Sequence, residues 1–290
     1  MQETHVVLVG AATDTVMVAL KFTVGLASGS SALVADALHS LSDLVSDGVT
    51  LAGLRAARRP PDEDHSFGHG RYDTITALAI GVFLVVVGAA IVVSAYASLR
   101  DGTVPPVPGP AALWIAGLAI VAKELLFHLT ASVARQHNSR ALAAGAWHHR
   151  TDALSSVAAF GGIAGARLGG PQWAILDPIA GGVVGLIIVV VGAAFVFRAL
   201  REMSDASLSP AKCAQILATA AGVEGVRDPH SLKTRRLGPT VAVEIHVRVA
   251  PDMSVQKAHE LATEVERRIR ALFSTEARVI THIEPMKSEL

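Results

Sequence analysis

The stretch TITALAIGVFLVVVGAAIVVSAYASL, residues 74–99, contains no Asp, Glu, Lys, Arg or His. An α-helix needs about 20 mainly apolar residues to cross the hydrocarbon core of a membrane, because each residue adds about 1.5 Å. This stretch therefore predicts a transmembrane helix. Residues 178–200, with the run GGVVGLIIVVVGAAFVF, are nearly as apolar and predict a second one.

Four further segments approach the same length but carry ionisable residues. The six predicted spans are residues 6–26, 32–54, 74–99, 111–133, 143–168 and 178–200. Ionisable side chains are costly at membrane depth and usually serve a function there. In these spans they are Asp14, Lys21, Asp36, His39, Asp43, Asp47, Lys123, Glu124, His128, His148, His149 and Asp152. Lys and Arg are concentrated in the loops that would lie on the side of both termini, which predicts cytoplasmic termini.

The composition of the chain excludes several classes of protein. With 51% hydrophobic and 17% charged residues, the chain differs from an ordinary soluble domain. A formal net charge of zero gives no reason to expect nucleic acid as a partner. Cys213 is the sole cysteine, so metal chemistry would fall to His, Asp and Glu. The start MQETH lacks the basic region of a signal peptide, and we expect the first apolar segment to be retained.

After the last predicted span the pattern changes to that of a soluble α/β unit. SLSP, residues 207–210, predicts the start of a helix. TVAVEIHVRV, residues 240–249, alternates as a strand does, and a strand is also expected around residues 226–234. An amphipathic helix over residues 254–273 and a last strand over residues 277–285 complete the predicted order of helix, strand, strand, helix, strand. The predicted domains are a six-helix transmembrane domain, residues 1–203, and a small cytoplasmic α/β domain, residues 204–290.

Two of the predicted spans carry a histidine and an aspartate four residues apart. His39 and Asp43 lie in the second span, and His148 and Asp152 lie in the fifth. Residues four apart share one face of a helix. If the two helices pack together, two imidazoles and two carboxylates form the four-ligand set that Zn²⁺ accepts at about 2.0–2.2 Å. A single such group often serves only as a hydrogen bond between helices, but two matching pairs favour a metal site.

The same cluster predicts coupling to protons. Two ionised Asp neutralise one divalent cation, and two adjacent buried carboxylates are costly to keep charged once that cation has left. Protons are then expected to replace the ion at the Asp and His side chains. Asp14 and Asp36 are interpreted as partners of Lys21 or as polar lining of the access path.

Three stretches resemble the cation diffusion facilitators, a family of metal/proton antiporters. They are SSALVADALHSLSDLVSD (residues 30–47), AWHHRTDALSS (residues 146–156) and DPIAG (residues 177–181). The resemblance covers nearly the whole chain and implies six transmembrane helices with a ferredoxin-like, metallochaperone-like tail. It implies that the two His/Asp pairs form the transport site. Histidine at the position of His39 is frequent in zinc-selective members, while Fe²⁺, Co²⁺ and Cd²⁺ stay open as cargo.

The loop PPDEDHSFGHGRYD, residues 60–73, places Asp62, His65 and His69 close together in sequence. Three such ligands in a Gly-bearing loop can wrap one ion, although a solvated polar loop without metal would have the same composition. The family resemblance favours a loop metal site at these residues.

By the same resemblance, five residues of the tail match cytoplasmic metal sites at a dimer interface, with Zn²⁺ as a structural ion. They are His230, His246, His259, His282 and Glu284. Arg71 and Asp205 match a charge pair that ties the two halves of a homodimer together. The implied partners are a second copy of the chain, the lipid bilayer, divalent metal ions and protons, in the cell (inner) membrane.

Other functions fit the sequence less well. His259 and Glu260 open the metalloprotease pattern H-E-x-x-H, but Thr263 stands where the second His is needed. A Walker motif is absent from the sequence, so we expect an ion gradient rather than ATP to supply energy. The chain is predicted not to be an enzyme. A membrane-bound metal sensor that binds without transporting remains the alternative.

Overall fold

The computed structural model describes residues 3–100, 105–136 and 140–286. Its packing divides the chain into two compact units. The first consists of Met1–Val49 and Ile80–Phe195, and the second of Thr50–Ala79 and Val196–Leu290. The predicted boundary between residues 203 and 204 stays a prediction.

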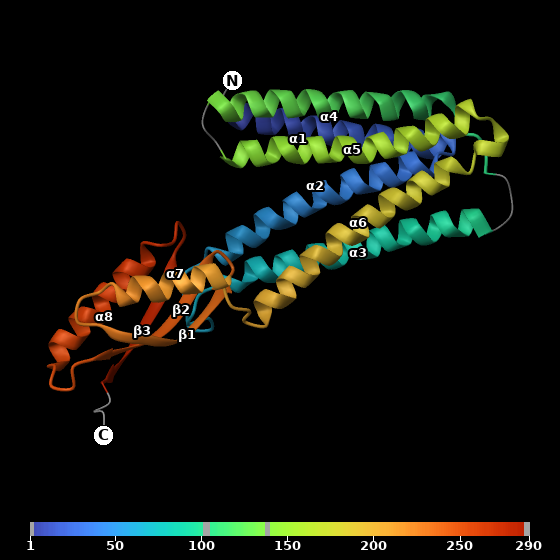
Figure 1. Cartoon of the computed structure of the whole chain (residues 1–290). Coiled ribbons are helices and arrows are strands. Elements are labelled where there is room, and N and C mark those ends of the chain that lie inside the picture. Colours follow the sequence, from blue (N-terminus) through green and yellow to red (C-terminus); the bar gives the residue numbers. More distant parts are fainter. Residues whose placement is uncertain (1–2, 101–104, 137–139, 287–290) are drawn as a thin grey trace. The chain divides into compact units, whose positions relative to one another are not determined.

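Each of the six predicted spans lies inside one long helix (Figure 1). These helices are α1 (Glu3–Ser28), α2 (Ser31–Ala57), α3 (Arg71–Arg100), α4 (Pro110–Gln136), α5 (Arg140–Leu168) and α6 (Leu176–Met203), with a short 3₁₀ turn, η1 (Pro171–Trp173), before α6. Within the described ranges, four segments are long and apolar enough to cross a membrane by length and composition, and they fall on α1, α3, α4 and α6. The two long helices outside this set, α2 and α5, bear the predicted transport ligands. The count of six spans therefore stays a prediction.

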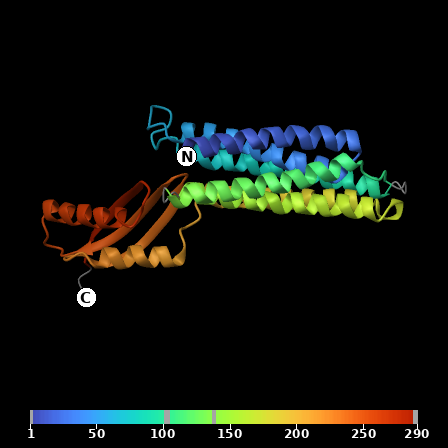
Figure 2. The same ribbon diagram turned by 90° about the horizontal axis from the view of Figure 1, so that it is seen from above.

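Small residues allow the helices of the first unit to pack closely. Helices α4 and α5 lie side by side (Figure 2), and α1 also packs on α4. Between α3 and α6 the backbones nearly touch, since a Cβ on Gly88 would lie 2.7 Å from the carbonyl oxygen of Gly185. Lipid tails are as apolar as a leucine, so close van der Waals contact of this kind is what holds membrane helices together.

Asp177 on α6 caps the start of α2. Its carboxylate accepts the backbone N–H of Ser31 and the hydroxyl of Ser30, each at 2.6 Å. The first turn of a helix has N–H groups without partners inside the helix, and a carboxylate there satisfies them. This contact fixes the beginning of the helix that carries His39 and Asp43.

The tail has the predicted order of helix, strand, strand, helix, strand. Its elements are α7 (Pro210–Ala221), β1 (Arg227–Leu237), β2 (Thr240–Val249), α8 (Val255–Arg270) and β3 (Ala277–Pro285). Helix α7 begins as predicted, with Ser209 as its cap and Pro210 in the first turn. The sheet order is β1-β2-β3, with β1 antiparallel and β3 parallel to β2.

The helices α7 and α8 pack against one face of this sheet. Alternate residues of β2, namely Val241, Val243, Ile245 and Val247, are buried in the core that they form with residues of both helices. Side chains of the intervening residues point to the other face. His246 therefore lies on the face away from the helices.

Candidate metal centres

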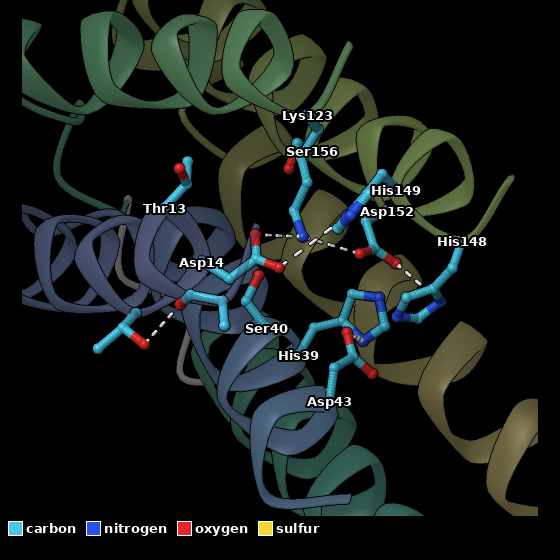
Figure 3. Close-up of polar contacts among 12 residues, drawn as sticks. Thr13, Asp14, His39, Ser40, Asp43, Lys123, His148, His149, Asp152 and Ser156 are labelled. Atoms are coloured by element: carbon cyan, nitrogen blue, oxygen red, sulfur yellow. Dashed lines mark hydrogen bonds and ion pairs between the residues drawn. The ribbon is translucent and has the colours of Figure 1, made fainter. Parts of the chain in front are cut away.

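Helices α2 and α5 bring three of the four predicted transport ligands together. His39, Asp43 and Asp152 each offer a ligand atom, and these atoms lie within 4.8 Å of one another. Figure 3 shows the side chains of His39 and Asp43 directed toward those of His148 and Asp152. The Nδ1 atom of His39 is buried without a hydrogen-bond partner among the described residues, which leaves a free donor atom at the site.

His148 lies at the edge of this cluster. Its Nδ1 is 3.7 Å from Asp152 Oδ1, and its side chain is 51% exposed, against 7% for Asp152. His149, the next residue, instead faces Asp14, at 4.0 Å. The two adjacent histidines thus point to different carboxylates, as the 100° step between neighbouring helical residues requires.

Two buried lysines neutralise carboxylates beside the cluster. Lys21 Nζ lies 2.7 Å from Asp36 Oδ2, which confirms Asp36 as one of its two expected partners. Asp14 pairs instead with Lys123, at 2.7 Å, and the same ammonium is 2.9 Å from Asp152. Lys123 is among the ionisable residues of the predicted spans, but the sequence predicts no partner for it. The presence of a single lysine in the apolar stretch of α4 was the sequence feature that could have indicated a buried carboxylate partner.

A cavity of about 370 Å³ opens beside these groups. Its lining includes the polar residues Asp14, Ser40, Asp43, Asp47, Lys123, Thr130, His148, His149 and Asp152. A polar cavity inside an apolar helical unit can admit water and a hydrated ion to the ligands.

The loop between α2 and α3 brings its three predicted ligands together. Asp62 Oδ2 is 3.3 Å from Nε2 of His69, Asp62 Oδ1 is 3.5 Å from Nδ1 of His65, and the three residues form one potential metal-binding group. His69 Nδ1 lies 3.2 Å from the carbonyl oxygen of Pro60. When Nδ1 donates to that carbonyl, Nε2 is left as a free donor for a metal. A hydrogen bond from the backbone N–H of His65 lowers the pKa of Asp62, so the ligand is charged near neutral pH.

The open face of the tail sheet gathers three of its five predicted ligands. Pairing between strands places His230 opposite His246, and His246 beside His282. Glu284 lies 3.0 Å from His246 Nδ1 and 3.3 Å from His230 Nε2. The hydrogen bond with His246 lowers the pKa of Glu284. The donor set of two imidazoles and one carboxylate suits Zn²⁺.

The other two predicted tail ligands stand apart from this group. The ring centroid of His282 is 4.6 Å from that of His246, so His282 adjoins the group without belonging to it. His259 is on α8 and lines a separate cavity with Thr281 and Ile283. The sheet separates the helix side from the open face, and within one chain His259 is not brought to the other four residues.

Arg71 and Asp205 are in contact, as the resemblance implied. Arg71 Nη2 lies 2.7 Å from Asp205 Oδ1, and Arg235 Nη1 lies 3.1 Å from the other carboxylate oxygen. Arg71 and Asp205 are exposed, and Arg235 is partly exposed. Asp205 has a positive φ of 56°, which turns the chain sharply after α6.

Comparison with known protein families identifies the class of protein. The family model of the cation efflux transmembrane domain matches residues 7–204, and that of the cation efflux protein cytoplasmic domain matches residues 208–286. The chain belongs to the cation efflux, or cation diffusion facilitator, family of multi-pass membrane transporters for metal ions.

Three relatives illustrate the range of the family around this chain. Metal tolerance protein 2 of Oryza sativa subsp. japonica is 34% identical, with 94% of this chain and 76% of the relative aligned. Manganese efflux system protein MneP of Bacillus subtilis is 29% identical, with 98% and 96% aligned. Magnetosome protein MamB of Magnetospirillum gryphiswaldense is 30% identical, with 89% and 85% aligned.

Proposed function

We propose that this chain exports a divalent transition-metal ion from the cytoplasm in exchange for protons, with Zn²⁺ as the first candidate cargo. The observation that carries the proposal is the convergence of His39 and Asp43 on α2 with Asp152 on α5. His148 completes the ligand set from the edge of the cluster. An alternating-access carrier binds its cargo near the membrane midplane.

Proton coupling is proposed from the chemistry of the ligands. Asp43 and Asp152 balance the two charges of the bound ion. When the ion leaves, the carboxylates and imidazoles are the groups that can take up protons in its place. Protons moving inward would then drive the ion outward.

The donor set favours first-row transition metals. Imidazole nitrogen suits Zn²⁺ and Fe²⁺, and carboxylate oxygen also suits Mn²⁺. The relative named for manganese efflux aligns over nearly the full chain, which makes Mn²⁺ the second candidate cargo. Fe²⁺, Co²⁺ and Cd²⁺ remain open as further cargo.

We further propose a homodimer in the cell (inner) membrane, with both termini and the tail in the cytoplasm. The tail would hold a structural Zn²⁺ through His230, His246 and Glu284, and the loop would hold an ion through Asp62, His65 and His69. Arg71 and Asp205 would support the dimer near the membrane surface. A sensor that binds metal without moving it is the alternative function.

Transport by the purified chain in proteoliposomes tests the proposal. With an imposed pH gradient, Zn²⁺ uptake is expected for the wild type and to be lost in Asp43→Ala and Asp152→Asn. Glu124→Gln is the matched control, because this carboxylate also lies at membrane depth but pairs with His128 outside the cavity. Gradient-driven uptake by Asp43→Ala would refute the mechanism, and binding without uptake by the wild type would favour the sensor. Competition by Mn²⁺, Fe²⁺, Co²⁺ and Cd²⁺ identifies the cargo.

A further inference from the structure

Lys123 makes two short contacts with carboxylates of two different helices. Its ammonium is 2.9 Å from Asp152 Oδ2 on α5 and 2.7 Å from Asp14 Oδ1 on α1. The lysine side chain is only 6% exposed, and it lines the same cavity as Asp43 and His148 (Figure 3). A positive charge thus occupies one oxygen of a carboxylate that is also a candidate ligand for a dication.

The contacts of Asp152 divide between its two oxygens. Oδ2 accepts from Lys123, whereas Oδ1 is 3.7 Å from His148 Nδ1. A metal ion and the ammonium therefore draw on the charge of the same carboxylate. At these short distances, two cations that share one anion weaken each other's binding.

Asp14 gives the ammonium a second anchor. It lines the cavity but lies outside the ligand group of His39, Asp43 and Asp152. When a metal ion draws on Asp152, Lys123 keeps a carboxylate partner and is not left as an unpaired buried charge, which would be strongly unfavourable.

The charges around the cavity also balance. Of its four acidic lining residues, Asp47 is exposed, and Asp14, Asp43 and Asp152 carry three formal negative charges against one on Lys123. The difference of two matches one divalent cation.

We propose that Lys123 is an affinity-setting residue of the transport site: it competes with the metal ion for Asp152, and Asp14 retains it when the ion binds. The inference rests on the proposed function, since it requires that Asp152 ligates the cargo. Lys123 would keep the affinity of the site for the metal ion low enough for the ion to be released. Affinity differences at one site appear mostly in the dissociation rate.

Equilibrium Zn²⁺ binding to the purified full-length chain tests the competition. The transport site is defined as the binding that Asp43→Ala removes, which separates it from ions held by the loop and tail. Lys123→Met keeps an unbranched side chain that is one atom shorter and removes the charge, so we expect about tenfold tighter Zn²⁺ binding at this site. In proteoliposomes the same variant should show a lower KM and a lower kcat, since a tighter ion leaves more slowly. Lys123→Arg keeps the charge and should stay close to the wild type.

The double variant Lys123→Met with Asp14→Asn tests whether Asp14 acts through Lys123 or through its own charge. Asp14→Asn alone should weaken Zn²⁺ binding severalfold, because the ammonium of Lys123 then pairs with Asp152 alone. In the Lys123→Met background the same change should have little effect, since Asp14 has no lysine left to hold. Equal effects in both backgrounds would refute the role of Asp14.

Failure of the competition and failure of the proposed function would give different results. If Lys123→Met binds Zn²⁺ as the wild type does, or more weakly, Lys123 merely supports Asp152 and the competition is refuted. If the wild type has no binding that depends on Asp43, the proposed function fails and the inference fails with it. Should Lys123→Met not fold, Asp14→Asn decides on its own, because unchanged binding in that variant contradicts the proposal.

Discussion

The ammonium of Lys21 lies 2.7 Å from the carboxylate of Asp36, and both side chains are almost completely buried. The same ammonium donates to the hydroxyls of Ser40 and Ser156, at 3.1 and 3.2 Å. These contacts join α1 to α2 and α5. Ser40 follows the ligand His39, and Ser156 lies one turn beyond Asp152, so this polar cluster holds the two ligand-bearing helices in register.

Asp36→Ala should destabilise the chain by about 3–5 kcal/mol, because it leaves the Lys21 charge buried without its partner. Thermal unfolding in detergent measures the loss. The double variant Lys21→Met with Asp36→Leu should recover a large part of it, since both charges are then gone. A single variant as stable as the wild type would contradict the structural role of the pair.

Gly88→Ala should destabilise the contact between α3 and α6 by about 1–3 kcal/mol, since its Cβ would meet the Gly185 carbonyl oxygen at 2.7 Å. Gly161→Ala on α5 is the matched control, because a Cβ there has nothing within 4 Å. The control should equal or slightly exceed the wild type in stability, as alanine favours helix. Equal melting temperatures for the two variants would argue against the close approach.

His69→Ala should remove one bound Zn²⁺ per chain, because the Nε2 of His69 is one of three donors in the loop group. Metal content of the purified full-length protein after equilibration and desalting gives the count. His128→Ala is the control, since His128 belongs to none of the three potential metal-binding groups of the described residues. Loss of metal from the control and not from His69→Ala would place the ion elsewhere.

Glu264 on α8 should contribute a pH-dependent stabilisation of the tail. It accepts hydrogen bonds from Arg267 and Arg268, at 2.7 and 2.6 Å, which lower its pKa to about 2. The unfolded value is about 4.3, so the contribution is fully present above roughly pH 5 and is lost as the pH falls toward the folded value.

Hydrogen exchange of α8 in the full-length protein measures this contribution. Glu264→Gln should lower the amide protection of α8 at about pH 7. The difference in protection between the variant and the wild type should become smaller between roughly pH 5 and pH 3. About 1 M salt should also reduce this difference in protection, because both arginine partners are exposed to solvent and salt screens exposed charges. A difference in protection that grows as the pH falls would contradict this stabilisation by ionised Glu264.

Much of the fold could be predicted from local patterns. Apolar runs identified six helices, and alternation in residues 240–249 identified the strand β2 with its exact bounds. The spacing of His39 with Asp43, and of His148 with Asp152, put each pair on one helix face. These predictions needed only the geometry of a single helix or strand.

The chain by itself therefore determined its helices, its α/β tail and the chemical nature of its candidate ligands, because periodicity and residue type are properties of neighbouring residues. Only the tertiary structure decided which charges meet. It paired Asp14 with Lys123 and Asp36 with Lys21, left His148 at the edge of its cluster, and placed His259 on the helix side of the sheet. Contacts between residues far apart in sequence depend on how helices and strands pack, and that packing is a sum over many side chains which local patterns do not encode.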